Sequence, residues 1–169
     1  MAEENKQEKK KVYVETTVVS DATALPTNNL TVAGRQMATR EWWSTAAERF
    51  DLYSSTVVSK EARRGDPDAA RRRVEALEDI PELVADERAV ALATRLIDAK
   101  AVPKEFPDDA LHIATAALNA MDYLVSWNFS HITNAQMIPK VRRVCEENGY
   151  RCPEICTPMM LQKEVHYDA

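Results

Sequence analysis

The stretch FPDDALHIATAALNAMDYLVSWN, residues 106–128, contains the sharpest change of pattern in the chain. Its first half predicts a helix, because Pro107 suits a first helical turn, and the Asp108 and Asp109 pair supplies a cap and the anions that stabilise a helix N-terminus. Its second half, at 123–127, is a short apolar run of β-forming residues, which predicts a buried strand. A helix that leads straight into a strand is typical of parallel α/β folds.

The segments on either side continue this alternation. The β-branched segment KVYVETTVVS at 11–20 predicts a central strand and its exit, and residues 52–59, centred on a Val-Val pair, predict a second strand. Ser59 is expected to cap a short helix that carries Glu61. Further expected elements are a loop at 21–30, helices at 31–50, 68–77, 87–100 and 135–148, and short strands at 83–86 and near Ile155.

Alternating strands and helices over the whole length predict an α/β domain with a parallel sheet covered by helices on both faces. We expect one domain at 11–169, preceded by a disordered tail at 1–10, where charged residues alternate with almost nothing apolar. Helical spacing identifies several side chains that should face the core: Met37, Trp42 or Trp43, Ala46, Val90, Ala93 and Ile97.

Composition narrows the functional classes. With 45% hydrophobic and 29% charged residues and no long apolar run, the chain is expected to be a cytoplasmic protein without a membrane span. Only 3 glycines argue against a Gly-rich phosphate loop, and 3 cysteines without a CxxC pair suggest reduced thiols rather than a zinc site. The net charge of −5 requires any nucleic-acid contact to come from a local patch or a bound metal.

Four oxygen ligands occur near strand–helix junctions: Glu15, Glu61, Asp109 and Asn128. Glu15 lies within a segment expected to form an apolar strand, where a carboxylate is costly unless it is paired or binds a metal. The ends of parallel strands converge, so these side chains can share a pocket. Mg²⁺ and Mn²⁺ prefer such ligands, and a divalent cation can activate water against a phosphodiester.

Each acid also has a purely structural explanation. Glu61 and Asp109 are expected in first helical turns, where negative charge is favoured, and Glu15 could pair with an arginine. Asp108 suits a cap better than a ligand. The combination nevertheless favours a site, because Glu15 has no propensity reason to stand where it does.

Three segments carry a resemblance to a known family: YVETTVVS, VVSKEARRG and DDALHIATAALNAMDYLVSWNFSHI. They resemble the signature segments of the PIN-domain family, in the branch close to VapC-type toxins, and the likeness covers residues 11–161. It implies a PIN-like, Rossmann-like three-layer α/β/α sandwich with a central, mainly parallel sheet. It also implies an Mg²⁺- or Mn²⁺-dependent endoribonuclease, the toxin of a type II toxin–antitoxin pair, with homodimers bound by a small antitoxin protein.

By position, the resemblance assigns catalytic and metal-binding roles to Glu15, Glu61 and Asp109, and a variable fourth metal position to Asn128. The chain departs from the family in two ways: Glu15 stands where the family usually has Asp, and Asn128 is neutral. Thr17 and Ser126 occupy places of small polar residues that can orient a ligand carboxylate or a metal water. Local capping or turn bonding explains them equally well.

Other polar residues have weaker assignments. Arg63 and Arg64, beside Glu61, are expected to bind substrate phosphates, whereas the arginines at 71–73 are expected to form a solvated face or pair with acids. His112 follows Asp109 by three residues on nearly the same helix face. A packing role with a hydrogen bond to a neighbour is favoured for it over a base role. His131 receives no role.

The sequence therefore predicts a metal-dependent ribonuclease. The main alternative is a PIN domain that has lost turnover and acts as an RNA- or protein-binding module, which Glu15 and Asn128 make plausible. A phosphatase with a carboxylate nucleophile is disfavoured, because no DxDxT-like segment follows the first strand.

Overall fold

A computed structural model describes residues 7–163 and contains one five-stranded sheet in which every neighbouring pair of strands is parallel. Its strand order is β3-β2-β1-β4-β5. The parallel α/β architecture expected from the sequence is confirmed. The strands are β1 (Lys10–Val14), β2 (Phe50–Ser55), β3 (Glu82–Leu83), β4 (Tyr123–Val125) and β5 (Glu154–Cys156).

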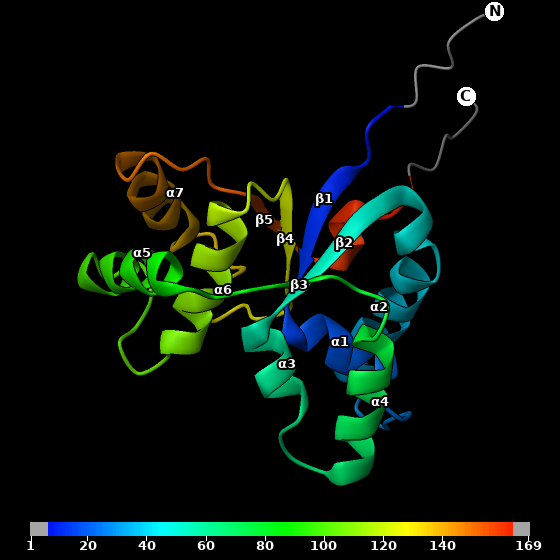
Figure 1. The fold of residues 1–169 in the computed structure, drawn as a ribbon. Coiled ribbons are helices and arrows are strands. Elements are labelled where there is room, and N and C mark those ends of the chain that lie inside the picture. The colour runs from blue at the N-terminus through cyan, green and yellow to red at the C-terminus, as the bar shows by residue number, and fades with distance from the viewer. Residues whose placement is uncertain (1–6, 164–169) are drawn as a thin grey trace, which may run out of the picture.

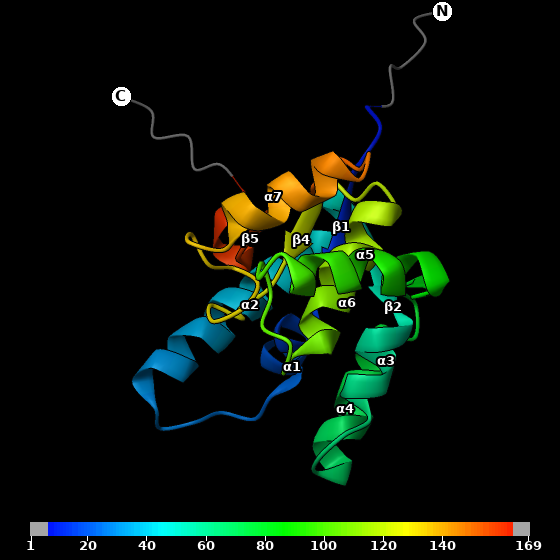
Figure 2. The same cartoon turned by 90° about the vertical axis from the view of Figure 1, so that its left-hand side faces the viewer.

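Helices cover both faces of the sheet and make the fold a three-layer α/β/α sandwich. In Figures 1 and 2, α5, α6 and α7 lie on one face, and α1 and α2 lie on the other. The helices within the described residues are α1 (Thr16–Thr23), α2 (Leu30–Arg49), α3 (Thr56–Ala62), α4 (Pro67–Leu77), α5 (Glu87–Asp98), α6 (Pro107–Leu118) and α7 (Ile138–Glu147), followed by a short 3-10 helix, Pro158–Leu161. Each of these helices is too short or too polar to serve as a membrane span.

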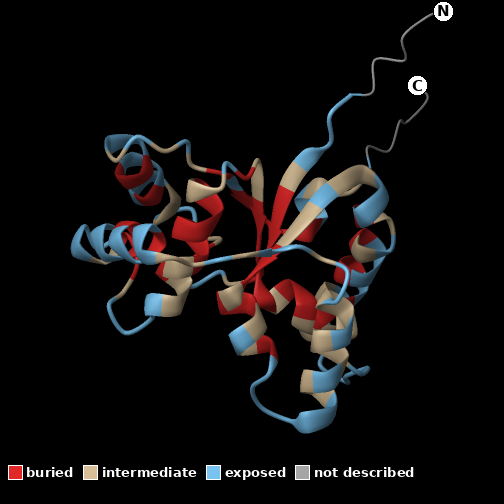
Figure 3. Cartoon of the chain, viewed as in Figure 1, coloured by how far each residue is buried: buried red, intermediate tan, exposed pale blue. Residues whose placement is uncertain are grey.

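The central strand β1 organises the core and the site. Val12 is paired with Leu52 of β2 and with Tyr123 of β4, so β1 has a neighbour on each side. Val12, Tyr13 and Val14 are fully buried, and Figure 3 shows this buried centre between the two helical layers. The residue that follows, Glu15, therefore emerges at the middle of the carboxyl edge of the sheet.

Residues 16–20 and 56–59, which are rich in β-branched side chains and were expected in strands or their exits, are helical instead. Each helix begins with a side-chain cap: Glu15 accepts the Thr17 N–H at the start of α1, and Ser55 accepts the Val58 N–H at the start of α3. The cap of α3 is thus Ser55 and not Ser59. Burial of the valines outweighs their modest helix penalty. These buried helical valines are Val18, Val19, Val57 and Val58.

The boundaries of other elements differ from the predicted ones by a few residues. The loop expected at 21–30 begins only after Thr23, and β1 begins at Lys10, inside the expected tail. Residues 1–6 of that tail, and the domain's last residues, 164–169, lie outside the described residues.

Helix α2 buries a face that includes Trp42 and Ala46, as expected, but not Met37. Ala38, Trp42 and Ala46 are buried at a spacing of four residues, as one helical stripe requires. Met37 is 66% exposed, because it lies about 100° around the helix from Ala38. Val90 of α5 is exposed too, since the buried face of that helix is formed by Ala89, Leu92, Ala93 and Leu96.

Asp122 connects three strands at the opposite, amino edge of the sheet. Its carboxylate accepts the Lys11 N–H at 2.8 Å and a bond from Arg151 at 3.1 Å, and its carbonyl accepts the Glu154 N–H at 2.9 Å. Burial opposes ionisation here, but the bonds from Lys11 and Arg151 outweigh it and lower the pKa of Asp122 below the ordinary 3.8.

We therefore expect Asp122→Ala to lower the free energy of unfolding by about 1–2 kcal/mol at neutral pH. Because the folded pKa is lowered, this contribution is present above pH 3.8 and is lost as the pH falls through the lowered value. Urea unfolding of both proteins at neutral and acid pH measures it. Asp51→Ala, an exposed acid on β2, is the control, and an undiminished difference at acid pH would contradict the assignment.

Candidate functional site

Glu15 is a buried carboxylate held from three directions. Its side chain is 3% exposed, and its Oε2 accepts bonds from the Thr17 N–H at 3.0 Å, the Ser126 hydroxyl at 2.9 Å and the Thr17 hydroxyl. Burial raises the pKa of Glu15, although the His112 charge and the Thr17 and Ser126 bonds oppose the shift. The fold thus places a carboxylate where ionisation is costly and fixes its orientation.

Glu61 reaches the same place from α3. Its Oε1 accepts the Thr16 hydroxyl at 2.8 Å and also bonds to Nε2 of His112. Burial acts to raise the pKa of Glu61, but the hydrogen bond and charge of His112 outweigh it, so the pKa is lowered. Glu61 is therefore the more readily ionised of the two glutamates.

His112 of α6 lies between the two carboxylates and is fully buried. Its Nδ1 is 2.7 Å from the Tyr13 hydroxyl, and its Nε2 bonds to Glu61 and is 3.9 Å from Glu15 Oε1. Burial alone would lower the pKa of His112, but the bond to Glu61 and the charge of Glu15 raise it. The imidazole thus packs in the core and hydrogen-bonds its neighbours, as the sequence favoured, and it offsets the negative charge of both glutamates.

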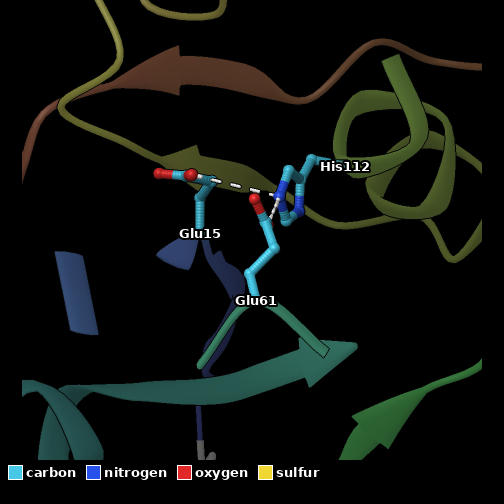
Figure 4. Close-up of side chains that lie close together, drawn as sticks. All are labelled: Glu15, Glu61 and His112. Carbon is cyan, nitrogen blue, oxygen red and sulfur yellow. Dashed lines mark hydrogen bonds and ion pairs between the residues drawn. The ribbon is translucent and has the colours of Figure 1, made fainter. Parts of the chain in front are cut away.

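These three side chains form a group that can hold a metal ion. Figure 4 shows Glu15, Glu61 and His112 converging from three elements, with His112 joined to both carboxylates. One ligand atom from each residue lies within 4.8 Å of the others. Two carboxylates with a nearby nitrogen donor are chemically suited to a divalent cation.

A cavity of about 380 Å³ opens beside Glu15 and Glu61. Its wall carries both signs of charge, because arginines stand next to the acids. Arg35 is paired with the buried Asp21, and Arg64 is largely exposed. The lining residues are Glu15, Thr16, Thr17, Ser20, Asp21, Arg35, Glu61, Arg64 and Arg73.

Asp109 and Asn128 lie at the same edge but contact His131 instead of joining the three-residue group. The Asp109 carboxylate is 13% exposed, and its Oδ2 is 2.9 Å from His131 Nδ1. The Asn128 side-chain carbonyl accepts the His131 N–H at 3.0 Å. Asp109 is still close enough for its charge to contribute to the raised pKa of His112.

Thr17 and Ser126 bond both to the Glu15 carboxylate and to the backbone of the turn after β4. Both hydroxyls bond to the Glu15 carboxylate, which fixes that ligand candidate. They also bond locally, because Thr17 Oγ1 accepts the Trp127 N–H at 2.9 Å and Ser126 Oγ accepts the Asn128 N–H at 3.0 Å. The turn after β4 and the Glu15 carboxylate are therefore held by the same hydroxyls.

The two adjacent arginines after α3 have different surroundings. Arg64 lines the acidic cavity and lies 3.6 Å from Asp108. Arg63 instead donates to the Ser59 carbonyl at 2.8 Å and lines a separate small cavity between α3 and α4. Asp108 is not the cap of α6, because Phe106 occupies that position without a side-chain bond.

Sequence reasoning missed several members of the site. Thr16 could have been suspected from its place beside Glu15. His131 carries no signal in the sequence, because its contact with Asp109 depends on how the loop after β4 returns toward α6. Arg35 and Arg73 come from α2 and α4 and likewise meet the cavity only through tertiary packing.

A comparison with models of known protein families gives no match for this chain, and a comparison with curated proteins gives none either. The likeness to PIN domains therefore stays a prediction.

Proposed function

We propose that this protein is a ribonuclease that hydrolyses RNA phosphodiester bonds with the help of Mg²⁺ or Mn²⁺. One observation carries the proposal: Glu15 and Glu61, which are far apart in the sequence, meet with His112 within 4.8 Å beside an open cavity. The carboxyl edge of a parallel sheet is where α/β folds place their sites. The PIN-like motifs support the same reading.

The donor set fits a hard divalent cation. Glu15 and Glu61 would hold the ion. The resemblance adds Asp109 as a third ligand and Asn128 as an assisting residue, and both would have to exchange their contacts with His131 for the ion. Both nitrogens of His112 already have partners, in Tyr13 and Glu61, which favours a charge-balancing role over metal ligation. A cavity of about 380 Å³ leaves room for the waters that Mg²⁺ keeps.

The bound cation would supply positive charge for the phosphate and lower the pKa of a nearby water. The chain's own residues orient the reactants. Thr17 and Ser126 hold the Glu15 carboxylate, while Arg64 and Arg73 are placed to contact phosphate oxygens. Hydrolysis adds the water oxygen to phosphorus, breaks the bond to the leaving sugar oxygen and transfers a proton to that oxygen.

The experiment that tests this function is cleavage of mixed tRNA and structured RNA by metal-stripped protein. We expect cutting only after Mg²⁺ or Mn²⁺ is added, together with a rise in thermal midpoint on addition of either ion. Cleavage that persists in excess chelator would contradict a metal-dependent nuclease. Absence of both cleavage and metal binding would favour the binding module described below.

A second candidate is an RNA- or protein-binding module without turnover. The position of Asn128 favours it, because the side-chain carbonyl of this neutral residue is occupied by the His131 N–H. Such a module need not bind Mg²⁺. Metal affinity, measured by calorimetry, distinguishes the two candidates.

The resemblance to VapC-type toxins extends the proposal to partners. The protein would act as the toxin of a type II pair, as a homodimer whose site is covered by a small antitoxin. An adjacent reading frame for a small protein that co-purifies with this chain and suppresses its cleavage would support this role.

A further inference from the structure

We infer that Tyr13 is a positioning residue of the candidate metal site: its buried hydroxyl orients His112, and His112 in turn holds the two glutamates ready for a divalent cation. Tyr13 acts through His112 and is not itself among the three side chains that can hold the ion. The inference rests on the proposed function, because the cation is the one that the proposed hydrolysis uses.

The Tyr13 hydroxyl lies in the centre of the core. Tyr13 is fully buried between Val12 and Val14 in the central strand β1. A buried hydroxyl costs folding free energy unless it forms hydrogen bonds. This hydroxyl forms two, because it lies 2.6 Å from Ser55 Oγ and 2.7 Å from His112 Nδ1. Its two partners belong to different elements, so the hydroxyl connects β1 to the end of β2 and to α6.

Strand geometry brings Tyr13 and its partners to one face of the sheet. Glu15 directly follows β1 with an extended backbone, so its side chain points to the same face as Tyr13. On the neighbouring strand β2, Tyr53 is the register partner of Tyr13, and Ser55 lies two residues beyond it. The His112 ring meets the Tyr13 ring edge to face, with centroids 5.8 Å apart.

The Tyr13 hydroxyl selects one of two orientations of the imidazole. The torsion about the bond from Cβ to the histidine ring has a roughly two-fold preference, and a half-turn exchanges each ring nitrogen with a ring carbon. In the observed orientation, Nδ1 faces the Tyr13 hydroxyl and Nε2 faces Glu61. The turned ring would present carbon to both buried partners and leave them without these bonds. Because a phenol hydroxyl both donates and accepts, it can bond to Nδ1 in either protonation state of the ring.

The oriented imidazole keeps two carboxylates close together before a cation binds. Glu61 Oε1 bonds to His112 Nε2, and Glu15 Oε1 lies 3.9 Å from the same nitrogen. Two neighbouring carboxylates repel each other when both are ionised, and the imidazole between them offsets this repulsion. A site whose ligands are already in place loses less conformational entropy when the ion binds.

Ser55 is bonded to Tyr13 and also caps the helix that carries Glu61. Its Oγ accepts the Val58 N–H at 3.2 Å at the start of α3. This cap does not require the Tyr13 hydroxyl, so loss of the hydroxyl should leave α3 in place and disturb the imidazole. Groups that orient metal ligands from outside typically contribute tenfold or more to metal affinity, about 10–100-fold in known sites.

Tyr13→Phe tests the inference, because it removes one buried oxygen and keeps the ring that packs in the core. We expect the Mn²⁺ affinity of the full chain, measured by calorimetry, to fall about tenfold or more. Tyr123→Phe is the matched control: it removes the hydroxyl of a tyrosine on the neighbouring strand β4, whose ring packs on Phe50, and should bind Mn²⁺ like the wild type. Thermal unfolding in chelator checks the fold of both variants. Equal Mn²⁺ affinity of the wild type and Tyr13→Phe would overturn the inference.

A double-mutant cycle shows whether Tyr13 acts through His112. His112→Gln places an amide near the position of Nε2 and has no counterpart of Nδ1, so the Tyr13 hydroxyl loses that partner. In this background, Tyr13→Phe should weaken Mn²⁺ binding by much less than it does in the wild type. An undiminished loss would show that Tyr13 acts by another route, which contradicts the positioning role.

Nitrogen-15 NMR of histidine-labelled, metal-free protein gives a readout that depends on neither cleavage nor the ion. The Nδ1 resonance of His112 should shift in Tyr13→Phe, because this nitrogen loses its hydrogen bond, and should not shift in Tyr123→Phe. The ring resonances of His131, which bonds to Asp109, should stay the same in both variants. A His112 Nδ1 resonance that Tyr13→Phe leaves unchanged would count against the inference.

Cleavage assays separate this inference from the proposed function. Mn²⁺-dependent RNA cleavage together with unchanged Mn²⁺ affinity in Tyr13→Phe overturns the positioning role and leaves the nuclease standing. Mn²⁺ binding that depends on the Tyr13 hydroxyl, in a protein that never cuts RNA, supports the positioning role and removes the nuclease. A wild type that binds no Mn²⁺ overturns both.

Discussion

Glu15→Gln is expected to reduce metal-dependent RNA cleavage at least about 100-fold and to remove the metal-induced rise in thermal midpoint. Glutamine has nearly the same shape as glutamate, and its carbonyl can still accept the Thr17 and Ser126 bonds. It lacks the negative charge that a divalent cation requires. Cleavage rates and thermal unfolding with and without Mn²⁺ measure both effects.

The same variant should be at least as stable as the wild type without metal. Burial raises the pKa of Glu15, which means that holding this carboxylate ionised at neutral pH costs folding free energy. The uncharged amide avoids part of that cost. Stability that rises when a functional group is removed is typical of sites in which function is gained at the expense of stability.

If Glu15 instead formed a purely structural ion pair with the buried His112, Glu15→Gln would have the opposite effects on stability and on cleavage. Removing one partner of a buried pair would then lower stability strongly while cleavage continued. That pattern would contradict the metal-site assignment. Glu41→Gln, an exposed glutamate on α2, controls for the general effect of losing one negative charge.

Asp109→Asn is expected to have the second largest effect, a loss of cleavage of about 100-fold or more with the fold retained. Asparagine preserves the size of the side chain and an oxygen that can bond to His131. It removes a carboxylate that lies one helical turn before His112, at the edge where Glu15 and Glu61 meet. Steady-state cleavage and thermal unfolding measure the two outcomes.

The neighbouring residue supplies a matched control. Asp108 lies in the same first turn of α6, but its carboxylate pairs with Lys60 and Arg64, at 3.7 and 3.6 Å, and makes no contact with His131. Asp108→Asn should therefore retain most of the cleavage activity. Wild-type cutting by purified Asp109→Asn would remove Asp109 from the site and weaken the ribonuclease proposal.

Charge distribution reconciles an acidic protein with a polyanionic substrate. The whole chain has a net charge of −5, which disfavours broad attraction to RNA. Three arginines nevertheless line the cavity beside the acids. Recognition in this proposal therefore depends on local contacts with phosphates and on the bound cation.

The local sequence pattern was sufficient to predict the parallel α/β architecture. The helix and strand of residues 106–128 appear as α6 and β4, and the alternation around them produces the parallel sheet. This works because apolar periodicity and chain breaks act over a few residues. Local pattern was wrong where burial competed with intrinsic propensity. Val18 and Val57 are β-branched and were expected in strands, but they are helical, because the helices bury them in the core.

The candidate site was also predicted only in part from the sequence. Glu15, Glu61, Asp109 and Asn128 could be named from their positions at strand and helix ends, because parallel strands bring such ends together. Their partners depend on distances between segments far apart in the chain, which local pattern does not contain. Only tertiary packing decided that His112 sits between Glu15 and Glu61, and that Asp109 meets His131.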